Sequence, residues 1–94
     1  MINRLKDKTI LITGASAGIG EACARLFAQQ GSNLIITARR EQKLLNLASE
    51  LQKEYQIQVL GKALDVRDSS AVESLISSLP DPFKHIDVLV NNAG

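Results

Sequence analysis

Hydrophobic residues form short, nearly continuous runs at four places in the chain, separated by polar and glycine-rich segments. Residues 9–13 (TILIT) and 34–37 (LIIT) are mostly β-branched and aliphatic, as expected for strands that are buried on both faces of a sheet. Less regular runs at 57–64 and 86–90 predict two more strands. The pattern therefore predicts four strands.

Between these runs, apolar residues recur at the spacing of amphipathic helices. The first predicted helix begins at Gly18 and ends before Gly31, which stands where a left-handed cap is wanted. A second helix is predicted over 44–55 and a third over 72–79. Residues 70–73 (SAVE) have the spacing of a capping box at the start of the third helix.

Strands and helices alternate strictly along the chain, which is typical of right-handed crossover units that build a parallel sheet. The predicted class is α/β, a Rossmann-like doubly wound parallel sheet with flanking helices. Two successive crossovers and a return past the first strand give the strand order 3-2-1-4. A ligand is expected at the switch point between strands one and four. Residues 1–94 are expected to form one domain.

Composition and charge add mainly exclusions. The chain has 11 basic and 10 acidic residues, mixed along its length, so no nucleic-acid or membrane partner is expected. No apolar run approaches the roughly 20 residues of a membrane span, and residues 1–6 are too short and polar for a signal peptide. The single Cys23 cannot form a disulfide framework or a multi-cysteine metal site. We expect a cytoplasmic protein without a metal centre.

Three glycines with the spacing G-x-x-x-G-x-G directly follow the first predicted strand, in residues 13–20 (TGASAGIG). Gly14 permits a tight turn, Gly18 lets the backbone approach a diphosphate, and Gly20 allows close packing of the helix. A turn that only connects strand and helix is the alternative. The lysine of a P-loop is absent, so a dinucleotide is favoured over a simple nucleoside triphosphate.

The start of the first helix carries the other candidate phosphate contacts. Free backbone N–H groups at the helix start would face the phosphates. Ile19, which lies there, is one of the predicted cofactor-binding residues. Ser16 either supplies a hydroxyl to the adenosine ribose or its phosphate, or only forms the turn. Some dinucleotide-binding relatives have a basic residue just before the second glycine, whereas this chain has Ala17.

The end of the second predicted strand decides between NAD and NADP. An NAD-binding protein of this fold places an acidic residue there, about 20 residues past the glycines, to hold the ribose 2′-hydroxyl. This chain has Ala38, Arg39 and Arg40 instead. Because guanidinium groups suit a 2′-phosphate, NADP is the predicted cofactor, with Arg39 and Arg40 as contacts. The alternative is that both are solvated surface charges.

Three motifs in order, residues 13–20, Asp65-Val66 and residues 91–94 (NNAG), resemble the short-chain dehydrogenase/reductase family over essentially the whole chain. Residues 79–90 look like the subgroup that oxidises serine and related 3-hydroxy acids with NADP. The resemblance implies that Asp65 hydrogen-bonds the adenine amino group and that the Val66 backbone meets the ring. Helix capping is the competing role for Asp65.

The resemblance also implies that the stretch from Asn91 to Gly94, with Asn91, Ala93 and Gly94 as the named cofactor contacts, lines the cofactor and braces the sheet. The implied activity is hydride transfer between the nicotinamide of NADP(H) and a small alcohol or carbonyl substrate, possibly a 3-hydroxy acid. The alternative is a stand-alone nucleotide-binding or regulatory module without catalysis. The last strand would leave an aliphatic sheet edge, so a homo-oligomer is expected.

No residue of this chain is predicted to be catalytic. The family's reductases use a serine together with a tyrosine and a lysine in the pattern Tyr-x-x-x-Lys, which these 94 residues lack. Tyr55 has Val59 four positions on and lies on a predicted apolar helix face. His85 stands alone in a predicted surface loop. We expect a dinucleotide-binding half-domain, truncated before the catalytic segment and inactive by itself.

Overall fold

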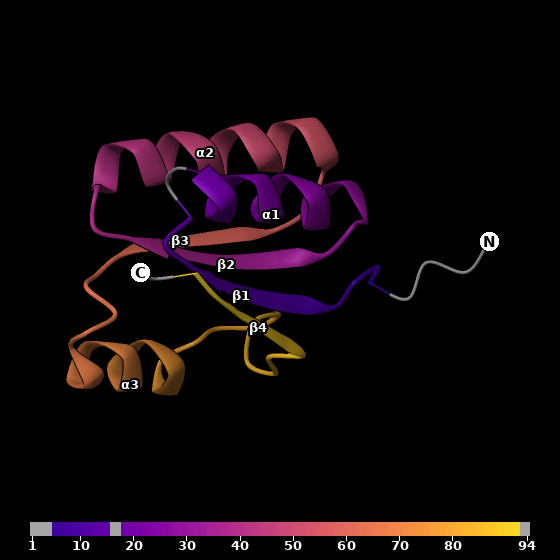
Figure 1. The fold of residues 1–94 in the computed structure, drawn as a ribbon. Helices are drawn as coiled ribbons and strands as arrows, with labels where there is room; N and C mark the ends of the chain where they lie inside the picture. Colours follow the sequence, from indigo (N-terminus) through magenta and orange to yellow (C-terminus); the bar gives the residue numbers. More distant parts are fainter. Residues whose placement is uncertain (1–4, 16–17, 93–94) are drawn as a thin grey trace.

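A parallel sheet forms the middle layer of the computed structural model, which describes residues 5–15 and 18–92. Within these residues the strands are β1 (Thr9–Thr13), β2 (Asn33–Ala38), β3 (Val59–Ala63) and β4 (Val88–Asn91). Their order in the sheet is β3-β2-β1-β4, and all neighbouring pairs are parallel (Figure 1). The predicted fold class and strand order are confirmed.

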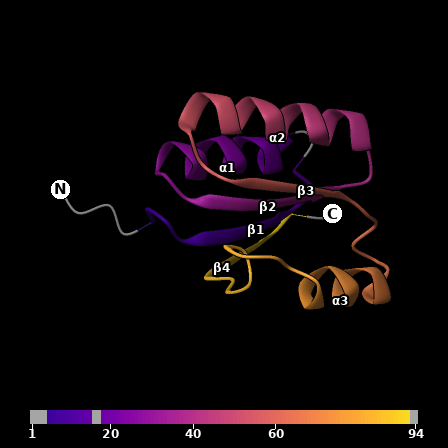
Figure 2. The same cartoon turned by 180° about the vertical axis from the view of Figure 1, so that it is seen from behind.

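The helices cover the two faces of the sheet unequally. α1 (Gly18–Gln29) and α2 (Glu41–Tyr55) lie side by side on one face, and α3 (Ser69–Ser77) lies on the other (Figures 1 and 2). Gly31 has a φ of 82° and its N–H donates to the Ala28 carbonyl at 3.0 Å. The predicted left-handed cap after the first helix is therefore confirmed.

The central strands are buried along nearly their whole length. Side chains alternate between faces in a strand, so Ile10, Ile12 and Ile36 contact the α1–α2 side while Leu11 and Ile35 contact the α3 side. Both faces thus need apolar residues, which explains the continuous hydrophobic runs. Within the described residues, no helix is long and apolar enough to cross a membrane.

The outer strands are shorter than or shifted from their predicted ranges. β3 covers Val59–Ala63 rather than 57–64, because its ladder with β2 runs only from the pair Leu34 and Val59 to the pair Ala38 and Ala63. β4 covers Val88–Asn91 rather than 86–90, because it pairs with β1 from Ile10 onward. In each case the partner strand sets the bounds.

The predicted capping box of the third helix is wrong. The N-cap of α3 is Asp68, whose Oδ1 accepts the backbone N–H of Ser70 at 3.1 Å and of Ala71 at 3.3 Å. Ser70 lies inside the first turn, so its hydroxyl is not at the capping position. A carboxylate is among the preferred N-cap groups. The helix also ends at Ser77, before the predicted end at Leu79.

Candidate functional site

The carboxyl ends of the four strands bring the predicted site segments to one edge of the sheet. Because all strands run in the same direction, the segments after β1, β2, β3 and β4 meet at that edge, on the left in Figure 1. The strand order places the turn after β1 in the middle, with the segments after β2 and β3 to one side. Ligands of open parallel sheets bind at such a carboxyl edge.

The turn after β1 has the backbone conformation that its glycines allow. Gly14 has a φ of 66° and Gly18 a φ of 60°, values that residues with a Cβ rarely adopt. Among the described residues, apart from the chain neighbours of Gly18 and the backbone of its own helix, no atom lies within 4 Å of the position where a Cβ on Gly18 would stand. Open space therefore faces the start of α1, and Ile19 beside it is 72% exposed. Ser16 lies outside the described residues.

Gly20 is enclosed where Gly18 is open. A Cβ on Gly20 would overlap the carbonyl oxygen of Gly14 and lie 2.8 Å from the side-chain nitrogen of Asn92. The adjacent Ala15 N–H donates to the Thr37 carbonyl of β2 at 3.0 Å. The turn is thus held between α1, β2 and the end of β4. The helix was predicted to pack closely at Gly20, and it does so against the carbonyl of Gly14 and the side chain of Asn92.

Thr13 joins the ends of β1 and β4. Its hydroxyl accepts the backbone N–H of Asn92 at 3.0 Å and lies 3.1 Å from Oδ1 of Asn91. The side-chain amide of Asn92 also donates to the Gly14 carbonyl at 3.5 Å. Asn91 and Asn92 therefore brace the turn, while the predicted contacts Ala93 and Gly94 lie outside the described residues. Asn92 belongs to the stretch 91–94 that the family resemblance implied as a brace of the sheet, whereas Thr13 was not identified from the sequence as a contact residue.

The end of β2 presents two cations at the site edge. Arg39 and Arg40 are both exposed. Arg40 is the N-cap residue of α2, but no side-chain hydrogen bond caps this helix. Two basic groups therefore stand at the positive end of a helix dipole, where an anion is favoured. Glu41, in the first turn of α2, partly offsets their charge.

Asp65 and Arg67 form an ion pair just after β3. Oδ1 of Asp65 accepts the backbone N–H of Arg67 at 2.9 Å and its Nε at 3.1 Å, and Oδ2 accepts Nη2 at 2.8 Å. This hydrogen bonding from the Arg67 side chain, with smaller contributions from its backbone N–H and from the charge of Arg39, lowers the pKa of Asp65 from 3.8 to about 2. Asp65 is therefore an ionised acceptor at neutral pH.

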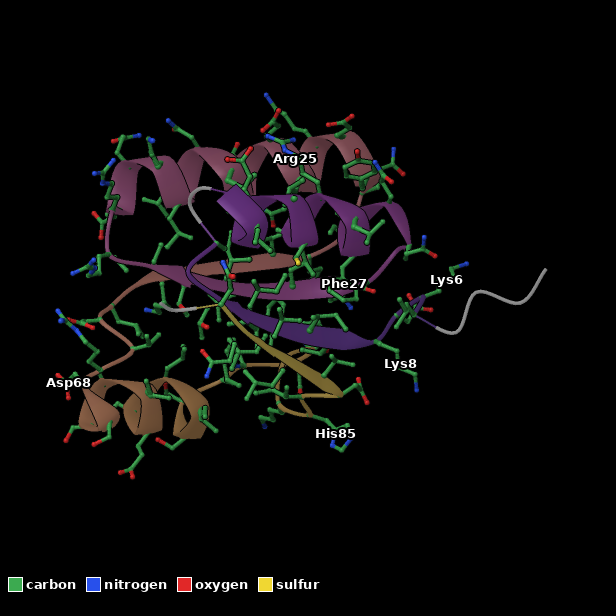
Figure 3. The ribbon with its side chains drawn as sticks, in the orientation of Figure 1. Lys6, Lys8, Arg25, Phe27, Asp68 and His85 are labelled. Atoms are coloured by element: carbon green, nitrogen blue, oxygen red, sulfur yellow. The ribbon has the colours of Figure 1, made fainter. Side chains whose placement is uncertain are left out.

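The competing capping role of Asp65 is not observed, because Asp68 caps α3. Asp68 lies at the start of that helix, beyond the strand edge (Figure 3). Val66 follows Asp65 and is half-buried. Arg67 was not identified from the sequence, although an arginine two residues after an aspartate has the spacing for such a pair.

His85 and Tyr55, which the sequence analysis did not assign to the site, lie away from the carboxyl edge of the sheet. His85 points away from the body of the protein on the α3 side (Figure 3), and its Nε2 lies 3.5 Å from Oδ1 of Asp87. Asp87 also accepts the Thr9 N–H at 2.9 Å, at the opposite edge of the sheet from the glycine turn. Tyr55, the last residue of α2, packs partly buried against the core, as predicted.

Comparisons with known proteins agree with this geometry. The family model of the short chain dehydrogenases matches residues 8–94. Sulfoacetaldehyde reductase 2 of Chromohalobacter salexigens is 51% identical over 90% of this chain and 33% of its own length. The NADP-dependent 3-hydroxy acid dehydrogenase of Schizosaccharomyces pombe is 47% identical over 99% of this chain and 36% of its own. Serine 3-dehydrogenase of Agrobacterium fabrum is 48% identical over 92% and 33%.

A solved structure shows the same fold. L-Sorbose reductase from Gluconobacter frateurii, complexed with NADPH and L-sorbose, superposes with a TM-score of 0.92 at 36% sequence identity, covering 100% of this chain and 36% of that one. The chain thus spans about a third of the length of the relatives it matches. The turn, the sheet order and these similarities together confirm the resemblance read from the motifs. This chain belongs to the short chain dehydrogenase family.

Proposed function

We propose that this chain binds NADP(H) and is the cofactor-binding portion of a short-chain oxidoreductase that transfers hydride between nicotinamide and an alcohol or carbonyl substrate. The observation that carries the proposal is the arrangement at the carboxyl edge of the sheet. There the glycine turn, the cations after β2 and the ionised Asp65 follow three adjacent strands.

The glycine turn suits the diphosphate of the cofactor. Space beside Gly18 admits a ligand close to the backbone, and α1 begins there, where the first N–H groups of a helix have no partner within the helix itself. We propose Gly14, Gly18, Ile19 and Gly20 as the residues of this subsite, with Ser16 as a further candidate. The positive end of the helix dipole adds to the attraction for phosphate.

The segments after β2 and β3 suit the adenosine end. Arg39 is proposed to contact the 2′-phosphate, with Arg40 as a second cation, because no acidic residue stands at the end of β2. Asp65 is proposed to accept the adenine amino group, with the Val66 backbone against the ring. Asn91, Ala93 and Gly94 are proposed to line the cofactor beyond β4.

The names of the relatives support a substrate of the 3-hydroxy acid class. The tyrosine and lysine that the family uses for proton transfer have no counterpart in these 94 residues. We therefore propose that this chain by itself binds cofactor without turnover. A cytoplasmic location and a homo-oligomer stay predictions.

The test is a calorimetric titration of the chain with NADPH and with NADH. We expect a preference for NADPH that Arg39→Ala removes, at a cost of about 1.5–3 kcal/mol for NADPH alone, the range for hydrogen bonds to charged groups. Lys53→Ala is the matched control, because it also removes a cation but lies in the last turn of α2. Equal affinity of the wild type for both cofactors would contradict the NADP assignment.

A further inference from the structure

Both carboxylate oxygens of Asp65 accept hydrogen bonds from the same residue, Arg67. Arg67 donates from its backbone N–H and Nε to Oδ1, and from Nη2 and Nε to Oδ2 at 2.8 and 3.2 Å. Such a two-point fork fixes the plane of the carboxylate as well as its charge. The side chain therefore has one orientation instead of several.

This arrangement leaves acceptor capacity on Asp65. A carboxylate has about four lone-pair sites, whereas Arg67 brings three donor groups, with Nε shared between both oxygens. Among the described residues, no other residue is seen to donate to this carboxylate. One further donor can therefore bind without displacing Arg67.

The ion pair between Asp65 and Arg67 contributes little to the stability of the fold. The Arg67 side chain is 77% exposed and the Asp65 side chain 37%, and exposed ion pairs of this kind contribute little to folding. Asp65 does not cap a helix, and both residues lie beyond the end of β3. The pair lies at the proposed adenosine end of the site. There the positive charge of Arg39 also acts on Asp65 and helps to lower its pKa.

We propose that Arg67 is a positioning residue for recognition of the cofactor base: it holds Asp65 as an oriented acceptor for an amino group. The inference rests on the proposed function and deepens it. An ionised carboxylate only accepts hydrogen bonds, so it favours a base with a 6-amino group over one with a 6-oxo group. Arg67 thereby selects adenine over hypoxanthine through Asp65, while Arg39 selects the phosphate.

The experiment compares the dissociation constants of NADP, NAD and the hypoxanthine analogue of NADP for four proteins: the wild type, Arg67→Met, Arg39→Ala and Lys53→Met. The wild type is expected to prefer NADP to the hypoxanthine analogue about tenfold or more, the value of a hydrogen bond to a charged group. Arg67→Met is expected to reduce this ratio severalfold and to leave the ratio of NADP to NAD unchanged. Lys53→Met removes an equal charge elsewhere and should change neither ratio.

Each outcome separates the inference from the function on which it rests. If Arg67→Met keeps the wild-type preference for adenine, or weakens all three ligands by the same factor, Arg67 has no positioning role. If the wild type binds none of the ligands, the proposed function fails and the inference with it. If NADP is preferred to NAD through Arg39 while Arg67 has no effect, only the inference fails. Thermal unfolding of each variant verifies that it is folded.

Discussion

The two faces of the sheet differ in how completely helices cover them. On one face, helices of 12 and 15 residues pack over Ile10, Ile12 and Ile36. On the other, a helix of 9 residues is supplemented by Leu79 and Phe83 from the segment after it. The length of helix available, and not the hydrophobicity of the strands, sets the difference, since the central strands are buried on both sides.

β4 shows the same difference within one strand. Val88 and Val90 pack against the core on the α1–α2 side, whereas Leu89, which pairs in register with Leu11 and so faces the α3 side, is 61% exposed. The residues with the stronger structural constraint are thus those on the α1–α2 face. The candidate site, at the carboxyl edge of the sheet, lies at the ends of the helical layers on both faces.

The comparison predicts unequal costs for the same truncation on each side. Leu51→Ala in α2 should destabilise the fold by about 3–5 kcal/mol, and Leu75→Ala in α3 by about 2–3 kcal/mol, because a cavity costs more where the surroundings are tightly packed. Leu51 is fully buried, whereas 6% of the surface of Leu75 is exposed to solvent. Urea unfolding of both variants measures the two values. Equal costs would mean that the α3 side is as tightly packed as the other.

Helix capping offers a smaller contrast between the faces. Asp68 and Arg40 both have the extended backbone of an N-cap, but only Asp68 accepts hydrogen bonds through its side chain. Asp68→Ala should therefore cost about 1 kcal/mol, whereas Arg40→Ser should stabilise α2 by up to about 1 kcal/mol. Denaturant midpoints report both changes. Ser70→Ala serves as a control, and a loss as large as that of Asp68→Ala would restore the capping box.

The smallest expected effect concerns two threonines on the α3 side of the sheet. Within the described residues, the Thr37 hydroxyl is buried with no hydrogen-bond partner, while the Thr13 hydroxyl joins β1 to β4. Thr37→Val should leave stability unchanged or raise it by about 0.5–1 kcal/mol, because a buried unpaired hydroxyl is removed. Thr13→Val should instead lower it. Thermal unfolding compares them, and a marked loss in Thr37→Val would reveal a partner for that hydroxyl.

Local patterns predicted most of the fold. The runs at β1 and β2 and the helical spacing around Leu44 and Leu51 depend on which side chains are buried, and burial leaves a periodic trace in sequence. The strand order followed from two successive crossovers and a return past the first strand. Positive φ at Gly14 and Gly18 agreed with the role predicted for a glycine turn.

What the sequence did not predict depends on partners distant in the chain or on small shifts along it. The bounds of β3 are set by β2, and the bracing of Thr13 comes from Asn92, 79 positions away. Asp68 and Ser70 both have cap chemistry, so residue type alone could not choose between them. Arg67 was missed because a surface arginine next to an aspartate is common, and its orientation is visible only in three dimensions.

The contact between Thr13 and Asn92 also has a consequence for the order in which the site matures during synthesis. The glycine turn is among the first segments made, yet Asn92 leaves the ribosome 79 residues later. At cellular elongation rates that delay is roughly 4–16 seconds. During this interval β1, α1, β2 and α2 can already assemble, but the turn has not yet received its last brace. The nascent chain therefore acquires its finished glycine turn only when β4 arrives, and we expect it to bind cofactor only after Asn92 has been made.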